Sequence, residues 1–168
     1  MGSVEEERSL GTLLRQLVTL MDGEVDAFYV REGLPLRSRY TPVIKALLRR
    51  DSATIKQLAA DVGLTHSALS QTISQMTKEG LVIGRPGDDP RERHIRLTPA
   101  AKALLPRIKE CWRLFDAAAA SVSSDAGASL AAVCASAIAA LEAKPFGERI
   151  KAAGQPKKAR SSRSKQKP

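Results

Sequence analysis

Residues 54–80 contain two short helical patterns that meet at a single glycine, and this arrangement limits the folds open to the chain. Thr54 and Gln57 have the spacing of a capping box, which predicts a helix of about two turns ending at Gly63. Thr65 follows directly and is a suitable N-cap for a second helix, which is expected to end near Gly80. Two short helices joined by a tight glycine turn predict a helix-turn-helix.

The second helix has an apolar side and a polar side that carries almost no charge. The residues expected on the apolar side are Leu69, Thr72, Ile73 and Met76. The opposite side presents hydroxyls and amides, which can donate and accept hydrogen bonds at base edges in a DNA major groove. We predict a DNA-binding face formed by Thr65, His66, Ser67, Ser70, Gln71 and Ser74, with Lys78 directed to phosphate. The alternative is a solvated surface without a partner.

A β-hairpin pattern follows this helix, and long helical patterns lie on both sides. Residues 81–83 and 94–97 are β-type runs separated by a segment dense in turn residues, which predicts a hairpin, or wing. Apolar residues at helical spacing predict a long helix over residues 5–31. A short helix is expected over residues 41–50, with Thr41 as its cap.

The last third of the chain is rich in alanine and is expected to form two close-packed helices. Thr98-Pro99 predicts the start of a helix that runs to about residue 122 and is kinked or opened at Pro106. Ser123 or Ser124 is expected to begin the final helix. Pro145-Phe146-Gly147 is expected to close it.

The formal charge of +9 is concentrated at the carboxyl end. Residues 151–168 contain seven Lys or Arg and no acid, so residues 1–150 contain 20 basic and 18 acidic side chains, a balance of +2. Composition alone is therefore weak evidence for a nucleic-acid partner. The tail is too polar to bury and is expected to be disordered. It is either a tether that adds nonspecific phosphate contacts or a merely solubilising segment.

Several protein classes are excluded because the sequence lacks the residue patterns that they require. Cys111 and Cys134 lie far apart without Cys-x-x-Cys spacing, so neither a disulfide framework nor a zinc site is expected, and both are interpreted as small buried residues. The acidic amino terminus and the lack of an apolar run of roughly 18 residues predict a soluble cytoplasmic protein. We find no catalytic grouping and expect neither enzymatic activity nor a cofactor.

The order of these elements resembles the MarR (multiple-antibiotic-resistance regulator) family of winged helix-turn-helix transcription factors. The resemblance is carried by LAADVGLTHSALSQTISQMTKEGLV at residues 58–82, by Asp89-x-Arg91 in the wing, and by Leu97-Thr98-Pro99 at the next helix. The resemblance is best over about residues 41–105, whereas the outer helices match in length and apolar pattern more than in amino-acid identity.

This resemblance implies that the helix from Thr65 is a recognition helix and that the wing enters or borders a minor groove. It further implies that Asp89 orients Arg91 against DNA, with Arg85 and Arg93 as additional contacts. The alternative for Arg91 is a surface ion pair with an acidic neighbour. The chain departs from the family pattern in having Gln71 where a base-contacting Arg is frequent, and in a wing about one residue shorter, so an operator sequence is not transferred.

We therefore predict a mainly α fold with a small β-hairpin wing. A winged helix-turn-helix DNA-binding lobe (41–98) is flanked by dimerisation helices (5–40 and 99–145), within a domain of residues 1–150 that precedes a disordered basic tail (151–168). The first helix and the last two carry long apolar stripes that the lobe cannot cover. We therefore predict a twofold homodimer, which would bind a pseudo-palindromic operator.

The resemblance also implies a ligand-responsive repressor with a small aromatic or phenolic effector, held between the dimerisation helices and the lobe. Tyr29, Trp112 and Phe115 either line such a cavity or, as is usual for aromatics at helical spacing, pack in the core. The alternative function is a winged-helix protein-interaction module without specific DNA binding.

Overall fold

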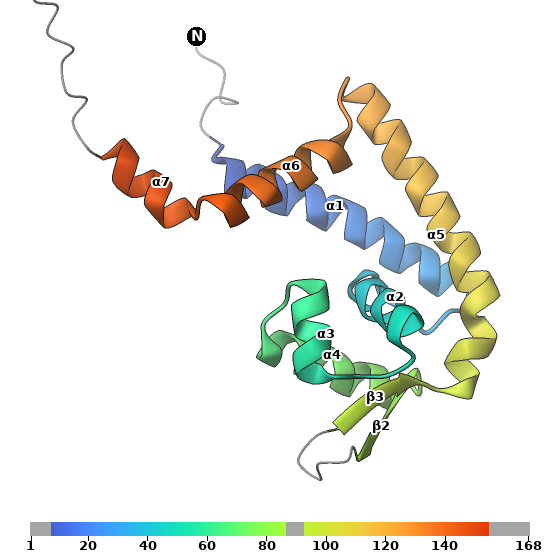
Figure 1. Cartoon of the computed structure of the whole chain (residues 1–168). Helices are drawn as coiled ribbons and strands as arrows, with labels where there is room; N and C mark the ends of the chain where they lie inside the picture. Colours follow the sequence, from blue (N-terminus) through green and yellow to red (C-terminus); the bar gives the residue numbers. More distant parts are fainter. Residues whose placement is uncertain (1–7, 87–92, 155–168) are drawn as a thin grey trace, which may run out of the picture. The chain divides into compact units, whose positions relative to one another are not determined.

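The computed structural model describes residues 8–86 and 93–154, which are mainly helical with one small antiparallel sheet (Figure 1). The chain divides into two compact units, with the boundary after Phe115. The first unit contains the lobe that includes the helix-turn-helix, together with the first helix and the amino-terminal part of the long fifth one. The fold class expected from the sequence, mainly α with a β-hairpin wing, is confirmed.

Helix α1 starts later than the sequence predicts, whereas α2 has the predicted bounds but a different cap. Helix α1 (Leu10–Arg31) begins later than residue 5 because Ser9 is its N-cap and accepts a hydrogen bond from the Thr12 amide at 3.3 Å. After a short 3-10 helix, η2 (Ser38–Tyr40), comes α2 (Thr41–Arg50). Thr41 is wrong as the expected cap, since it has helical backbone angles and is the first residue of α2.

The helix-turn-helix forms with the caps that the sequence predicts. Both hydrogen bonds of the Thr54–Gln57 capping box are present at the start of α3 (Ile55–Val62). Gly63 ends this helix with a φ of +69°, a left-handed conformation that glycine adopts without strain. Helix α4 (His66–Lys78) then begins with Thr65, whose hydroxyl accepts from the Ala68 amide at 3.2 Å.

The predicted hairpin is present and belongs to a sheet of three strands. Strands β2 (Val82–Pro86) and β3 (Arg93–Leu97) pair antiparallel with Gly84 opposite Ile95, and residues 87–92 between them lie outside the described residues. The two-residue strand β1 (Ala53–Thr54) pairs with the other edge of β3, giving the order β1-β3-β2. The sequence analysis missed β1, which is too short to show a period.

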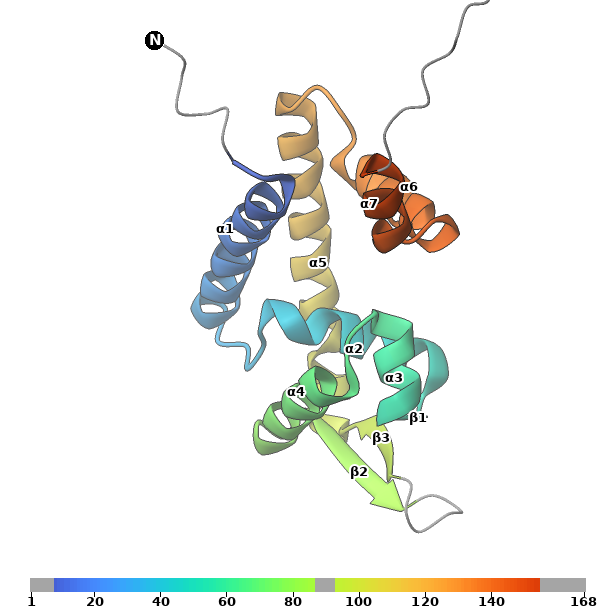
Figure 2. The same ribbon diagram turned by 90° about the vertical axis from the view of Figure 1, so that its left-hand side faces the viewer.

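One apolar core holds the lobe together. Its fully buried side chains come from α2, α3, α4 and the start of β2, and include Val43, Leu47, Leu58, Leu69, Met76, Leu81 and Val82. Helix α4 and strand β2 lie side by side (Figure 2). The core therefore fixes the exposed side of α4 relative to the wing strands.

Helix α5 (Pro99–Asp125) is longer than expected. Thr98 caps it by accepting from the Ala101 amide at 3.0 Å, and the helix continues without interruption through Pro106. Ser123 and Ser124 lie inside α5, so the expectation that one of them begins the final helix is wrong. The break comes at Gly127, whose φ is +68°, and Ser129 caps α6 (Leu130–Ala143).

Helix α6 ends at Ala143 with Lys144 as its C-cap, so its expected closure at Pro145 is confirmed. The sequence analysis missed the helix that follows: Pro145 occupies the N-cap position of α7 (Phe146–Ala153), and residues 151–153 of the predicted tail are helical. Proline is well suited to a helix start because it needs no amide partner there. Arg149 donates to the carbonyl oxygens of Ala140 at 2.6 Å and Lys144 at 3.0 Å, which are near the end of α6.

No single helix in the described part of the chain has the length and hydropathy needed to cross a membrane. Helices α5 and α6 satisfy the length and hydropathy criteria only when they are counted as one segment across the sharp bend between them.

Candidate DNA-binding surface

Helix α4 separates its apolar and polar residues onto opposite sides. Leu69, Thr72, Ile73 and Met76 are buried as predicted. The residues predicted to contact DNA from the opposite side are exposed, namely Ser67, Gln71, Ser74 and Lys78. Ser70 is half-buried at the edge of this face. We call Ser67, Gln71, Ser74 and Lys78 the polar face of α4.

The predicted residues at the start of α4 are also exposed, but one of them has a structural role. Thr65 uses its hydroxyl oxygen to cap the helix, which leaves its hydroxyl proton free to be donated. His66 is the first residue of α4, and its side chain lies at the helix end where backbone amides are unpaired. Helix amino termini attract phosphate, so this end suits a polyanion.

The wing carries two of its predicted cations on adjacent strands, on opposite faces of the hairpin. In the register of β2 and β3, Arg93 lies opposite Pro86 and Arg85 lies opposite His94. Both arginines are exposed, whereas His94 is half-buried. The other two predicted wing residues, Asp89 and Arg91, lie outside the described residues.

Polar contacts at the carboxyl end of α4 involve residues that the sequence analysis did not select. Glu79, the C-cap of α4, accepts from the Gln75 side chain at 2.9 Å, and its carboxylate lies 3.8 Å from the Arg37 guanidinium. The second oxygen of Glu79 and the hydroxyl of Tyr40 are buried without a hydrogen-bond partner among the described residues. Burial raises the pKa of Tyr40, and the Glu79 carboxylate raises it further. No local pattern marks the contacts of Glu79 with Arg37 and Tyr40, because they join segments about 40 residues apart.

A second ion pair ties α2 to α3. The guanidinium of Arg50 forms two hydrogen bonds with the Asp61 carboxylate, at 2.7 and 3.0 Å. The Asp61 side chain is about one-fifth exposed, so this fork-shaped contact is better shielded than most surface pairs. It fixes the first helix of the helix-turn-helix against the helix before it.

The three aromatic residues named in the sequence analysis pack in the core. Tyr29 and Phe115 meet edge to face with ring centroids 5.3 Å apart, and the Trp112 indole donates to the Tyr29 hydroxyl at 3.1 Å. Cys111 is buried, and burial raises the pKa of its thiol, so it is a small core residue as expected. Cys134 is exposed on α6, and its expected burial is wrong for a single chain.

A metal centre has no support in the described segments, 8–86 and 93–154, where no three His, Cys, Asp or Glu side chains gather in a way that could hold an ion. The surface of the lobe is instead defined by neutral hydrogen-bonding groups on α4 and cations around them.

Comparison with solved structures identifies the architecture. The regulator MOSR of M. tuberculosis, solved in complex with DNA, matches with a TM-score of 0.65 and 22% identity over 88% of this chain and all of that one. The chain has the fold of the MarR-family regulators. A MarR family regulator from Silicibacter pomeroyi matches with a TM-score of 0.60 and 20% identity over 79% of this chain and 94% of that one. A MarR regulator from Methanosarcina mazei Go1 gives 0.54 and 19% over 69% and 75%. No protein-family model and no curated protein matches the sequence.

Proposed function

We propose that the protein is a sequence-specific DNA-binding transcriptional regulator of the MarR type, with α4 as its recognition helix. The observation that carries this proposal is the polar face of α4, which is exposed, nearly uncharged and opposite a fully buried apolar side. Folding of the lobe makes no use of these side chains. Their donors and acceptors are the kind that contact base edges.

The dimensions of α4 suit this role. An α-helix with its side chains is about 10–12 Å across, and the major groove is about 12 Å wide. When the polar face of α4 lies on the floor of the groove, the exposed Arg85 and Arg93 of the wing are available for the neighbouring backbone or minor groove. MOSR, a protein with the same fold, was solved in complex with DNA, which supports DNA as the partner.

A homodimer is the second part of the proposal. Helices α6 and α7 expose large apolar side chains, including Val133, Ile138, Leu141, Phe146 and Ile150. Within the other unit, α1 exposes Leu10, Leu13 and Leu14. Apolar surface of this extent is usually covered by a partner, and a second copy of the chain is the simplest one. A twofold dimer places two recognition helices about 34 Å apart, which requires a pseudo-palindromic operator.

The remaining parts of the proposal are repression and response to a small aromatic or phenolic effector. An effector that binds one spacing of the two lobes better than the other shifts the population toward that spacing, by no more than its differential affinity. The support for this part is the family resemblance alone.

The test starts from duplexes that the full-length protein selects from a random pool. Affinity for a selected duplex and for a shuffled duplex is then measured for the wild type and for Ser67→Ala/Gln71→Ala/Ser74→Ala. The triple variant is expected to lose at least tenfold in preference for the selected duplex, because each good base contact contributes about 1–3 kcal/mol of discrimination. Binding to the shuffled duplex should persist, since phosphates dominate it.

Thr77→Ala is the matched control on the same helix. Thr77 is exposed, but its hydroxyl donates to the Ile73 carbonyl at 2.8 Å and so is already paired within α4. This variant should keep the wild-type preference. An unchanged preference in the triple variant, with its dimer intact, refutes the assignment of the polar face and favours the protein-interaction module.

A further inference from the structure

The segment between α1 and α2 carries two arginines and is firmly held. Leu34 and Leu36 are buried in the lobe core, and the Ser38 amide donates to the Asp26 carboxylate at 2.5 Å. The chain is extended at Arg37 and then turns into η2. An arginine on this segment therefore has a fixed position relative to the rest of the lobe.

This segment contacts the carboxyl end of the recognition helix. Element η2 packs against α4, and the Arg37 guanidinium lies 3.8 Å from the carboxylate of Glu79. Arg39 stacks over the ring of the buried Tyr40 with its guanidinium carbon 5.5 Å from the centroid. Both arginines are exposed. Arg37 and Lys78 therefore lie at this end of α4, and Arg39 lies in the element that packs against the helix.

The side of α4 on which this segment lies can be worked out from the helical repeat. At 100° per residue, Gln75 and Glu79 lie roughly a quarter turn from the centre of the polar face. A helix that fills the major groove points its flanks at the two walls of the groove, which are the phosphate backbones. A segment packed against that flank therefore lies over a wall of the groove rather than over bases.

We infer that Arg37 and Arg39 form a phosphate-binding site for one wall of the major groove, separate from the polar face and the wing. This inference rests on the proposed function, because it takes α4 as the groove-binding helix. A guanidinium suits the task since its planar fork can form two hydrogen bonds with one phosphate.

The contact between Arg37 and Glu79 does not satisfy either side chain. At 3.8 Å it is longer than a hydrogen bond, and the Glu79 oxygen nearest to Arg37 already accepts from Gln75. The Arg37 side chain is 51% exposed and donates no hydrogen bond to the described residues. The Glu79 carboxylate therefore leaves the donors of Arg37 available for a phosphate.

The salt dependence of DNA binding tests this inference with single charge-removing variants of the full chain. Affinity is measured over a salt series for Arg37→Gln and Arg39→Gln, on a duplex selected by the wild type and on its shuffled counterpart. Each lost phosphate contact lowers the slope of log affinity against log salt by about 0.9 per protomer, and by about twice that for a dimer on two half-sites. The ratio of the two affinities should stay at the wild-type value, because phosphate contacts carry no sequence information.

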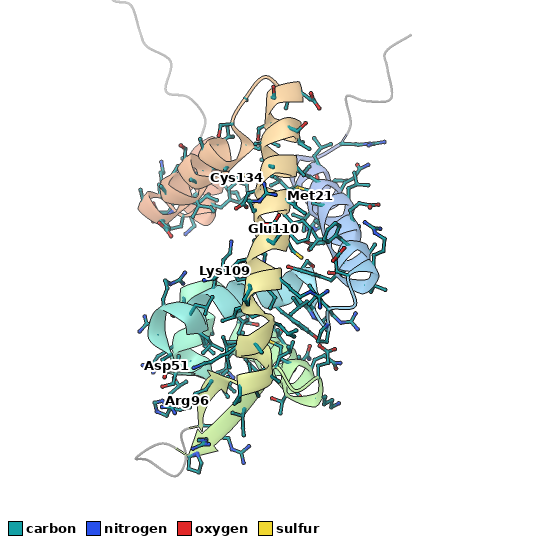
Figure 3. All side chains as sticks on the ribbon, turned by 90° about the vertical axis from the view of Figure 1, so that its right-hand side faces the viewer. Met21, Asp51, Arg96, Lys109, Glu110 and Cys134 are labelled. Carbon is teal, nitrogen blue, oxygen red and sulfur yellow. The ribbon has the colours of Figure 1, made fainter. Side chains whose placement is uncertain are left out.

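Two further variants separate a phosphate contact from a structural or general charge effect. Lys109→Gln removes an exposed charge from α5 (Figure 3) and should leave the slope unchanged. Glu79→Gln keeps Arg37 and removes the competing carboxylate, so affinity should stay equal or rise. If Glu79→Gln instead weakens binding as much as Arg37→Gln, the arginine only supports the helix end and the inference is wrong.

The outcomes also separate this inference from the proposed function. If Arg37→Gln and Arg39→Gln both keep the wild-type slope while the polar-face triple variant loses its preference, the phosphate site is refuted and the regulator stands. If the wild type itself shows no preference between the selected and shuffled duplexes, both proposals are overturned.

Discussion

Substituting Tyr29 by phenylalanine tests how α1, α2 and α5 are fixed to one another. The Tyr29 hydroxyl accepts from the Trp112 indole at 3.1 Å and lies 3.3 Å from the Thr41 hydroxyl. These contacts join α1 to α2 and to α5 through one buried group. Tyr29→Phe removes the hydroxyl and keeps the ring that packs edge to face on Phe115.

The expected loss follows from the hydrogen bonds, because ring packing is preserved. One net hydrogen bond contributes about 0.5–1.5 kcal/mol, and a buried donor left without a partner costs about 1–3 kcal/mol. Trp112 is half-buried, so water reaches part of its ring and the lower end applies. The 3.3 Å contact with Thr41 adds little. We expect Tyr29→Phe to lower the free energy of unfolding by about 1–2 kcal/mol.

Tyr40→Phe is the matched control for this substitution. Tyr40 is as completely buried as Tyr29, yet its hydroxyl makes no hydrogen bond of normal geometry in the described part of the chain, although Arg39 and Glu79 lie near enough to shift its pKa. The same chemical change should therefore leave the free energy of unfolding within about 0.5 kcal/mol of wild type. Urea unfolding followed by circular dichroism, at one fixed protein concentration, measures both variants.

A double-mutant cycle with Trp112→Phe identifies the bond responsible. If the Trp112–Tyr29 hydrogen bond carries the loss, the double variant should be less destabilised than the sum of the two single variants, by about 0.5–1.5 kcal/mol. Equal losses for Tyr29→Phe and Tyr40→Phe, or losses at Tyr29 and Trp112 that simply add, refute the reasoning.

Two further predictions concern the cap of α4 and the tyrosine hydroxyls. Thr65→Ala should lower the free energy of unfolding by about 1 kcal/mol and Thr65→Ser should restore it, as measured by urea unfolding, because Ser retains the oxygen that accepts from the Ala68 amide. Burial raises the pKa of Tyr29 and of Tyr40. The unfolded chain therefore loses these phenol protons at a lower pH than the folded chain does. The two hydroxyls should lower the free energy of unfolding as the pH rises above about 10, and they should have no effect at lower pH. The measurement is a series of unfolding curves at alkaline pH. A free energy of unfolding that stays constant above about pH 10 contradicts the raised pKa values of the two tyrosines.

The sequence predicted those parts of the fold whose signals are local. The caps at Thr54, Thr65 and Thr98 were predicted correctly because each hydroxyl bonds to an amide three residues away. The buried side of α4 was predicted for a similar reason, since a 3.6-residue repeat fixes which positions face one way. Thr41 failed because the 3-10 turn at Ser38–Tyr40 already supplies the start of α2.

Features that join distant segments were not predictable from one sequence. Strand β1 consists of two residues whose only partner is β3, some 40 residues later. Arg37 and Glu79 meet because the α1–α2 segment packs on α4, and no local pattern links the two residues. The carboxyl-terminal helices were misplaced because Ser123, Ser124 and Ser129 are all acceptable caps, and Gly127 decides among them.

The burial pattern separates the groups that hold the lobe together from those available to a partner. Every apolar position of α4 that the repeat directs inward is buried, and its polar face contributes nothing to that core. Substitutions on the polar face should therefore change binding while leaving the lobe folded. Helix α6 has the opposite character, because its apolar side chains Val133 and Ile138 are exposed. Replacing them should therefore change the stability of a single chain very little. Under the proposed homodimer, substitutions there should act on association between chains, so DNA contact and chain pairing should be separable by mutation.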